Sequence, residues 1–350
     1  MRADNQAKNK IKNRNLILKK IIMNGTISRK ELSEFTGLTK MTVTNIVSEL
    51  TLDKLICEES IVPLAAVGRH PVSLIPSGEV NIIGIYLSRD YVNVFMGNLC
   101  GKITEECRTS FSDETKESIT EKIFSSVDDL MEKYGEAIGI GISSIGPVDV
   151  KTGTILNPPN FFGITDFAIK KCLADRYGIP VYLDNDMNTS AIAEKYWGNA
   201  GGISNYVYLG ASNGIGAGVI TEGKIRENII AEIGHVSINL DGKKCHCGNS
   251  GCLEMYCSIE KDYNSEDADD KCRYLAMGGV TLMNMFNPEA IFLGHRIPML
   301  GDDAPEKIKK IMDGRYITHK TNDVKVCFSK FGRNAPVYGA IAVFIEHYEF

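Results

Sequence analysis

Apolar residues near the start of the chain recur with the spacing of amphipathic helices. In "IKNRNLILKKIIMNG" they form a helical stripe over residues 11–22 that stops at Gly25. A second pattern begins at Ser28, which can cap a helix together with Glu31 in a capping box. We expect this second, short helix to bury Leu32 and Phe35.

The second helix and the one after it are separated by a tight turn. The second helix is expected to end at Gly37, and Thr39 then opens a helix whose apolar positions are Val43, Ile46, Val47 and Leu50. Two short helices joined at a glycine are the helix-turn-helix pattern. The segment "DKLICEESIVPLAAVGRHPVSLIP" follows, with two β-prone stretches around a Gly-Arg-His-Pro tip, which predicts a β-hairpin wing.

The polar face of the third helix carries residue types that reach phosphates and base edges in a major groove, Ser48 among them. Arg69, in the wing, is placed to meet the backbone or a narrow minor groove. The alternative is a helical pair used for protein contacts. The candidate DNA-binding residues are Ser28, Arg29, Thr39, Lys40, Thr42, Thr44, Asn45 and Arg69.

The rest of the chain mixes strands and helices. "NIIGIYLSRDYVNVFMGNLCGKI" alternates as two strands around a polar turn, and "AIGIGISSIGPVDV" is a buried strand before a turn. "IPVYLDNDMNTSAIAEKYWG" is a strand followed by a helix, and "NYVYLGASNGIGAGVITEGKI" is a pair of strands around a glycine-rich turn. This pattern predicts an α/β body, in which ligands bind beyond the carboxyl ends of strands.

Polar side chains gather at one such strand end. Asp184, Asn185 and Asp186 are suited to hydrogen-bonding sugar hydroxyls, and one aspartate could act as a general base. Alternatively, Asp186 or Asn188 provides the N-cap of the next helix. The glycine-rich turn 210–218 could bring backbone N–H groups to an anion, but a tight hairpin explains it equally well.

Charge is distributed unevenly along these 350 residues. The net charge is −5, but residues 1–75 carry twelve lysines and arginines against seven acidic residues. A basic head on an acidic body suggests a polyanionic partner for the head. No apolar run approaches the roughly 18 residues of a membrane span, and the basic N-terminus lacks the apolar core of a signal peptide. We therefore expect a soluble, cytoplasmic protein without a membrane partner.

The ten cysteines fall into two groups. Six are scattered and are expected to be ordinary thiols in a reducing compartment: Cys57, Cys100, Cys107, Cys172, Cys272 and Cys327. The other four, Cys245, Cys247, Cys252 and Cys257, lie within thirteen residues. The first three of them and His235 together have the spacing H-x9-C-x-C-x4-C. Four such ligands fit a closed, tetrahedral, structural zinc site. His246 and Cys257 are possible substitutes as ligands.

The cysteine segment and several others carry a family resemblance. "EIGH…CHCGNSGCLE", "GISSIGPVDVKTGTILNPPN", "LDNDMNTSAIAE", "GIGAGVI" and "NMFNPEAIFLG" resemble the ROK family of repressors, open reading frames and sugar kinases. The resemblance implies an N-terminal winged helix-turn-helix followed by a two-lobed actin-like ATPase (ribonuclease H-like) fold. The domains would be 1–78, a first lobe 79–190 joined by a helix at about 336–350, and a second lobe 191–335 that contains the zinc loop 235–252.

The same resemblance implies roles for single residues. Zinc would be bound by the four residues of the spaced motif, and Asp186 matches the catalytic base of the kinase members. The sugar contacts would be Asn160, Asn185, Asp186, Glu232, His235 and Glu254.

Kinase members open their body with an Asp-x-Gly-Gly-Thr turn that holds the ATP phosphates. Here the stretch is "GIYLSRDYV", with Tyr86 in place of the aspartate and Ser88-Arg89 in place of the glycines. The late glycine pair near the nucleotide is Gly294-His295. We therefore predict a sugar-responsive repressor rather than a kinase, with operator DNA and a sugar or sugar phosphate as partners. A kinase with a fused DNA-binding head is the alternative.

A palindromic operator would require a homodimer or homotetramer. The segment between Ser258 and Tyr274 is shorter than is usual in the family. The second lobe is therefore expected to be shortened in the region of the oligomer interface.

Overall fold

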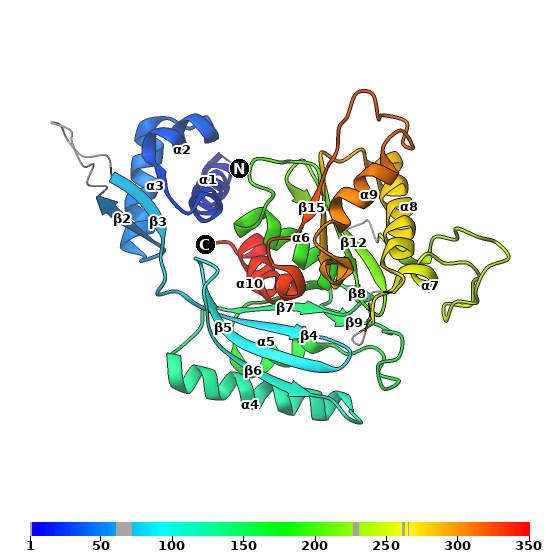
Figure 1. Cartoon of the computed structure of the whole chain (residues 1–350). Helices are drawn as coiled ribbons and strands as arrows, with labels where there is room; N and C mark the ends of the chain where they lie inside the picture. The colour runs from blue at the N-terminus through cyan, green and yellow to red at the C-terminus, as the bar shows by residue number, and fades with distance from the viewer. Residues whose placement is uncertain (1, 61–71, 227–230, 261–262, 265) are drawn as a thin grey trace. The chain divides into compact units, whose positions relative to one another are not determined.

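The computed structural model describes residues 2–60, 72–226, 231–260, 263–264 and 266–350 (Figure 1). The chain divides into two compact units, one formed by residues 1–184 with 340–350 and the other by residues 185–339. None of the helices in the described ranges is both long and apolar enough to cross a bilayer.

The first unit begins with three helices and a small sheet. These are α1 (Arg2–Asn24), α2 (Arg29–Thr36) and α3 (Lys40–Leu52), with β1 (Ile27–Ser28), β2 (Ile56–Ser60) and β3 (Val72–Pro76) in the antiparallel order β1-β3-β2. The capping box of Ser28 and Glu31 is present, Gly37 ends α2 in the left-handed conformation, and Thr39 caps α3. The core between the helices is formed by Ile17, Leu18, Ile21, Leu32, Val43, Val47 and Leu50.

One expectation for this head was wrong. Phe35 is 64% exposed, with the Lys20 ammonium 5.9 Å from the centre of its ring, whereas Leu32 in the same helix is fully buried. Phe35 lies in the last turn of an eight-residue helix. Helical spacing identifies the face on which a residue lies, but it does not say how far the neighbouring helices extend along that face.

The first unit also contains a five-stranded sheet of order β10-β7-β4-β5-β6. Strands β4 (Asn81–Leu87), β5 (Tyr91–Asn98) and β6 (Ile103–Ser110) are antiparallel, and β4 pairs in parallel with β7 (Ile140–Ser144). The other elements are β8 (Val148–Asp149), β9 (Thr154–Ile155), β10 (Val181–Asn185), α4 (Lys116–Tyr134) and α5 (Ile169–Tyr177). Strand β7 is buried throughout, as its apolar run predicts.

The second unit repeats this strand order. Its sheet is β13-β12-β11-β14-β15, formed by β11 (Tyr206–Ala211), β12 (Ile215–Thr221), β13 (Lys224–Ile225), β14 (Ala290–His295) and β15 (Lys325–Phe328). In each sheet three antiparallel strands are followed by a fourth that pairs in parallel with the first. The helices are α6 (Asp186–Trp197), α7 (Glu254–Cys257), α8 (Ala268–Phe286) and α9 (Ala304–Met312). Helix α10 (Ala335–His347) begins in this unit and continues into the first.

The end of the chain contacts the first helix within the first unit. Arg14 Nε donates to the backbone oxygen of Phe350 at 3.1 Å, and the Phe350 N–H donates to Asn15 Oδ1 at 2.9 Å. The same Arg14 guanidinium contacts Asp53 Oδ2, just beyond α3, at 2.5 Å. Helix α1 is therefore bonded both to the segment after α3 and to the segment after α10.

Helix α10 lies very close to β7 because β7 has no side chain at Gly141. A Cβ built on Gly141 would lie 1.8 Å from the backbone oxygen of Ala340. We expect Gly141→Ala to lower the free energy of unfolding by about 1–3 kcal/mol, because the helix backbone must move. Thermal and urea unfolding measure the effect. Gly201→Ala is the control, since nothing lies within 4 Å of a Cβ there, and equal stability of the two variants would contradict the prediction.

Candidate metal and ligand site

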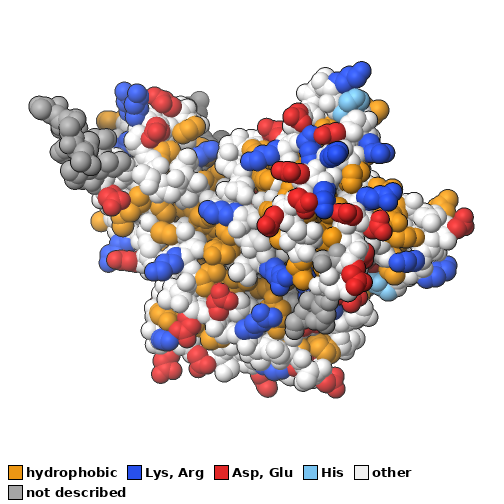
Figure 2. Space-filling model, viewed as in Figure 1, with side chains coloured by type: hydrophobic (Ala, Val, Ile, Leu, Met, Phe, Trp, Pro, Cys, Tyr) orange, Lys and Arg blue, Asp and Glu red, His pale blue; other side chains and the backbone are white. Residues whose placement is uncertain are grey.

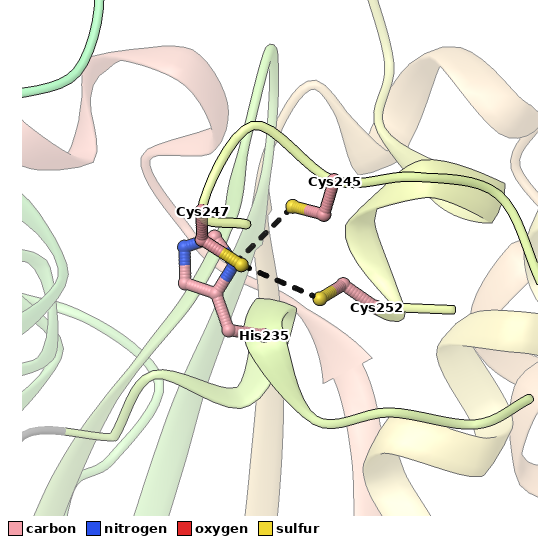
Figure 3. A group of neighbouring side chains, drawn as sticks. All are labelled: His235, Cys245, Cys247 and Cys252. Carbon is pink, nitrogen blue, oxygen red and sulfur yellow. Dashed lines mark hydrogen bonds between the residues drawn. The ribbon is translucent and has the colours of Figure 1, made fainter. Parts of the chain in front are cut away.

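The structure brings together the four side chains of the predicted metal site. His235 ends a short 3-10 helix (Ile233–His235), Cys245 and Cys247 lie in the following irregular segment, and Cys252 precedes α7. One donor atom from each residue lies within 4.8 Å of the other three. Figure 3 shows the four side chains turned toward one another.

The distances between the donor atoms fit a tetrahedral ion. Cys247 Sγ lies 3.7 Å from Cys252 Sγ, and Cys245 Sγ lies 3.7 Å from His235 Nδ1. Bonds of about 2.3 Å from zinc to sulfur place tetrahedral ligands roughly 3.8 Å apart. All ten cysteines are free thiols, so no disulfide competes for these sulfurs. The residues present therefore fit a metal with four protein ligands.

The backbone of the loop positions these ligands. Ser237 pairs with Cys252 and Lys244 pairs with Ser250 as isolated antiparallel bridges. Gly251 has a φ of 71°, and a Cβ there would lie 1.6 Å from the backbone oxygen of Asn239. Only glycine permits both this left-handed conformation and this close contact.

The two possible substitute ligands have different surroundings. Cys257 is fully buried, its Sγ donates to the Leu253 backbone oxygen at 3.5 Å, and burial raises the pKa of its thiol. It belongs to neither of the candidate metal groups found among the described residues. His246 belongs to a second group with His235 and Glu254, in which its Nδ1 lies 3.3 Å from Glu254 Oε1.

Glu254 lies directly beside the metal-ligand cluster. Its side chain is 7% exposed, and Oε1 is 3.2 Å from Cys245 Sγ and 3.5 Å from His235 Nδ1. Burial, with a smaller effect from this carboxylate, raises the pKa of Cys245 to about 12. A metal would have to displace that proton, since the thiolate is the ligand.

Asn185 and Asp186 lie at the start of α6. Asn185 is the N-cap, because its Oδ1 accepts the backbone N–H of Asn188 at 2.8 Å. The alternative in which Asp186 or Asn188 provides the cap is therefore wrong, because the side chain of Asn185 reaches the N3 amide. Asp184 is buried, at 1% exposure. Asp186 keeps a partly exposed carboxylate in the first turn.

A histidine from a distant strand faces that carboxylate. His295 Nε2 lies 3.8 Å from Asp186 Oδ2, and Nδ1 lies 3.0 Å from Tyr208 Oη. The tyrosine hydroxyl also accepts the backbone N–H of His295 at 3.2 Å, and burial raises its pKa. The sequence marked His295 only as a replaced glycine, and nothing in it pointed to Tyr208.

The glycines of turn 210–218 are explained by packing. Cβ atoms on Gly210, Gly216 and Gly218 would lie 2.6, 2.8 and 2.3 Å from atoms of Met187. Glycine lets the β11–β12 hairpin approach α6 closely. This supports the hairpin interpretation over an anion-binding turn.

The remaining candidate sugar contacts are more exposed. Glu232 is exposed and immediately precedes the 3-10 helix. Asn160 is exposed, has a φ of 54°, and belongs to the other compact unit. Among the six candidates, the structure thus brings His235 and Glu254 into contact, and the charges of His235, Glu254 and Asp186 all act on the carboxylate of Glu232. Asn185 and Asp186 are adjacent in the sequence, as the cap and the first residue of α6.

The stretch that would hold ATP phosphates in kinases is a tight hairpin turn between β4 and β5. The Ser88 N–H donates to the Tyr91 backbone oxygen at 2.9 Å, and Tyr86 packs edge-on against Tyr91 with ring centres 5.7 Å apart. Tyr86 is 7% exposed. An aromatic pair thus fixes this turn, which contains no glycine.

Some of the candidate DNA-binding residues already use their side chains in hydrogen bonds or ion pairs within the head, and others do not. Ser28 and Thr39 accept helix N–H groups as caps, and Arg29 is paired with Glu58 at 2.6 Å. Thr42 is half-buried, and Arg69 lies outside the described residues. The exposed remainder is Lys40, Thr44 and Asn45.

Comparison with known proteins agrees with this fold. Over 96% of both chains, the structure superposes with a TM-score of 0.80 and 23% identity on a crystal structure described as a ROK family transcriptional regulator, homolog of E. coli MLC protein. A ROK family glucokinase from Streptomyces griseus, in complex with glucose and AMPPNP, superposes with a TM-score of 0.65 and 23% identity. The glucokinase match covers 74% of this chain and 97% of the enzyme. The expected α/β, actin-like fold is confirmed.

The sequence comparisons define the family. The ROK family model matches residues 82–272, more than half of the chain, and the chain belongs to this family. The xylose repressor of Caldicellulosiruptor bescii is 29% identical over 382 residues, and the match covers 95% of each protein. The family predicted from the motifs is confirmed.

The metal cluster makes a specific prediction. We expect about one zinc per chain in the freshly purified protein and its loss in Cys247→Ser, because a tetrahedral site with three ligands binds much more weakly. Elemental analysis measures the metal. Cys172→Ser, outside the cluster, is the control and should keep it; a zinc-free wild-type protein would contradict the assignment.

Proposed function

We propose that the protein is a sugar-responsive, DNA-binding transcriptional repressor of carbohydrate-utilisation genes. The observation that carries this proposal is the match to a xylose repressor over 95% of each chain, which includes the helix-turn-helix head as well as the body. The head carries a net positive charge of 5, as expected for a domain that binds a polyanion. In this proposal residues 1–78 bind the operator.

The effector is a sugar or sugar phosphate bound by the polar side chains of the body, and xylose is the first candidate to test. Glu254 and Glu232 flank the metal loop, and Asp186 is held at the start of a helix. Carboxylates at fixed positions accept hydrogen bonds from sugar hydroxyls. The full contact set is that expected from the sequence: Asn160, Asn185, Asp186, Glu232, His235 and Glu254.

Zinc has a structural role in this proposal. Three cysteines and His235 would hold it, and when bound it would fix the loop that carries Glu254. With Nδ1 directed to the sulfurs, the other nitrogen of the His235 ring stays available to a sugar hydroxyl. The metal leaves no open position for water, so it supplies no chemistry to the sugar.

The proposal excludes ATP-dependent phosphorylation. A kinase needs close backbone approach to phosphates and a carboxylate for the metal. Here Ser88 and Arg89 stand in a turn fixed by tyrosines, and a buried His295 ends β14. The alternative, a sugar kinase with a DNA-binding head, is favoured by Asp186 and by the fold shared with a glucokinase.

Effector binding changes DNA affinity because the sugar binds the two states of the protein unequally. Helix α10 leads from the second unit into the first, where Phe350 bonds to Arg14. Arg14 also contacts Asp53 beside α3, so this arginine provides a route from the body to the DNA-binding helix. The lobes are 79–190 with 336–350, and 191–335. The repressor acts as a homodimer or homotetramer on a palindromic operator.

The repressor proposal predicts specific binding of the full chain to DNA upstream of its own gene at about 0.1 M salt, weakening at least tenfold between roughly 50 and 200 mM. One sugar of a panel should shift this affinity. Gel shift and fluorescence anisotropy measure both effects. Tight sugar binding without any DNA footprint would instead indicate a sensor that acts through protein partners.

Asp186→Asn separates the repressor from the kinase. We expect it to weaken sugar binding by about 10- to 150-fold, since a hydrogen bond to a charged group contributes roughly 1.5–3 kcal/mol. Calorimetry measures the binding, and Asp175→Asn, an exposed residue of α5, should have no effect. ATP turnover that disappears in Asp186→Asn would overturn the proposal.

A further inference from the structure

The outermost face of α3 is formed by four residues spaced at i, i+4, i+7 and i+11. They are Met41, Asn45, Ser48 and Leu52, and they lie opposite the buried residues of the same helix. Met41 is 74% exposed and Leu52 is 82% exposed. Met41, at the N-terminal end of this exposed face, was not among the residues expected to contact DNA.

Most polar groups on and around this face are already bonded. Thr44 Oγ1 donates to the Lys40 backbone oxygen at 2.8 Å, and Ser48 Oγ donates to that of Thr44 at 3.0 Å. The hydroxyls of Thr39 and Thr42 bond to each other at 2.9 Å. Within the described ranges, the side-chain amide of Asn45 makes no hydrogen bond, so it is free to bind.

The carboxylates of this region are neutralised by α1. Glu49 pairs with Lys10 at 2.7 Å, and Asp53 pairs with Arg14 at 2.5 Å. The four residues of the exposed face carry no charge, and Lys40 precedes Met41 at the start of the helix. Elsewhere acidic and basic side chains are interspersed over the surface, as Figure 2 shows for one face of the molecule. An anionic duplex therefore meets no repulsion from the exposed face of α3.

The residue types on this face correspond to one part of the major-groove code. Guanine is most often read by arginine, and α3 contains none. Asparagine forms a paired hydrogen bond with adenine: N6–H donates to Oδ1, and Nδ2–H donates to N7. Apolar side chains contact the thymine methyl group. The N-terminal half of a recognition helix, where Met41 and Asn45 lie, is the part that contacts base edges.

We propose that Asn45 and Met41 are the specificity-determining residues of the head and that they read two A·T base pairs separated by one base pair. Asn45 bonds to an adenine, and Met41 contacts the 5-methyl group of a thymine. One helical turn of about 6 Å separates the two residues, which is close to two base-pair steps of about 3.4 Å. This inference rests on the proposed function, because it assumes that α3 binds operator DNA.

The test begins with selection of binding sites from random duplex DNA by the full-length protein. We expect each selected half-site to contain two A·T pairs separated by one base pair. Asn45→Ala should lose about 5- to 150-fold in affinity for the selected site, from roughly 1–3 kcal/mol per base contact, and accept other bases at one position. Met285→Ala, a 65% exposed methionine of α8, is the control and should behave as wild type.

Modified bases then test each contact directly. Replacing the adenine by 7-deazaadenine removes N7 and should weaken wild type but not Asn45→Ala. Replacing the thymine by deoxyuridine removes only the methyl group and should weaken wild type about three- to fivefold, but not Met41→Ala. Circular dichroism confirms that the variants are folded.

The outcomes separate the two proposals. A selected site that keeps its base preference in Asn45→Ala and Met41→Ala, or that has G·C pairs in the half-site core, overturns this inference and leaves the repressor in place. Failure of the wild-type protein to select any sequence overturns the repressor and this inference with it.

Discussion

Three cysteine sulfurs and one imidazole nitrogen meet within 4.8 Å in a loop that has little regular secondary structure. A bound cation would cross-link this loop, because the three thiolates and the imidazole would all be ligands of the same ion. The loop carries Glu254, whose carboxylate contacts Cys245 and both histidines of the segment. The position of a candidate ligand-binding carboxylate therefore depends on the metal-ligand cluster.

Each of the two units is built by close backbone approach. Gly141 lets α10 contact β7 in the first unit, and Gly210, Gly216 and Gly218 let a hairpin contact Met187 at the start of α6 in the second. Helix α6 in turn presents Asp186 to His295. The carboxylate of Asp186, which is proposed to bind a sugar, is thus positioned by packing, and a side chain at any of the three hairpin glycines would displace the start of its helix. The Arg14 contacts give the head a comparable connection to the end of the chain.

The function assigned to the body depends on the residues at two positions, the turn after β4 and the end of β14. The turn after β4 is fixed by a tyrosine pair, and the end of β14 holds a histidine that bonds to Tyr208 and faces Asp186. In this setting the carboxylate of Asp186 is an acceptor 3.8 Å from Nε2 of His295. That arrangement suits recognition of a hydroxyl group, and it supports a regulator that shares its fold with kinases. At the other end of the chain, an exposed amide and an exposed methionine on α3 supply the proposed base recognition.

The sequence by itself determined the features that depend on local spacing. The capping box at Ser28, the helix end at Gly37 and the order of strands and helices follow from neighbouring residues, and the cysteine motif predicted its own clustering. Tertiary structure decided which side chains are covered and which meet across the fold. Phe35 is exposed, Asn185 provides the cap, and Met41 is exposed at the start of α3. His295 reaches Asp186 only because β14 pairs beside β11 and α6 packs on the same sheet. Periodicity gives the direction of a side chain on its own element, whereas its partners depend on where distant elements are packed.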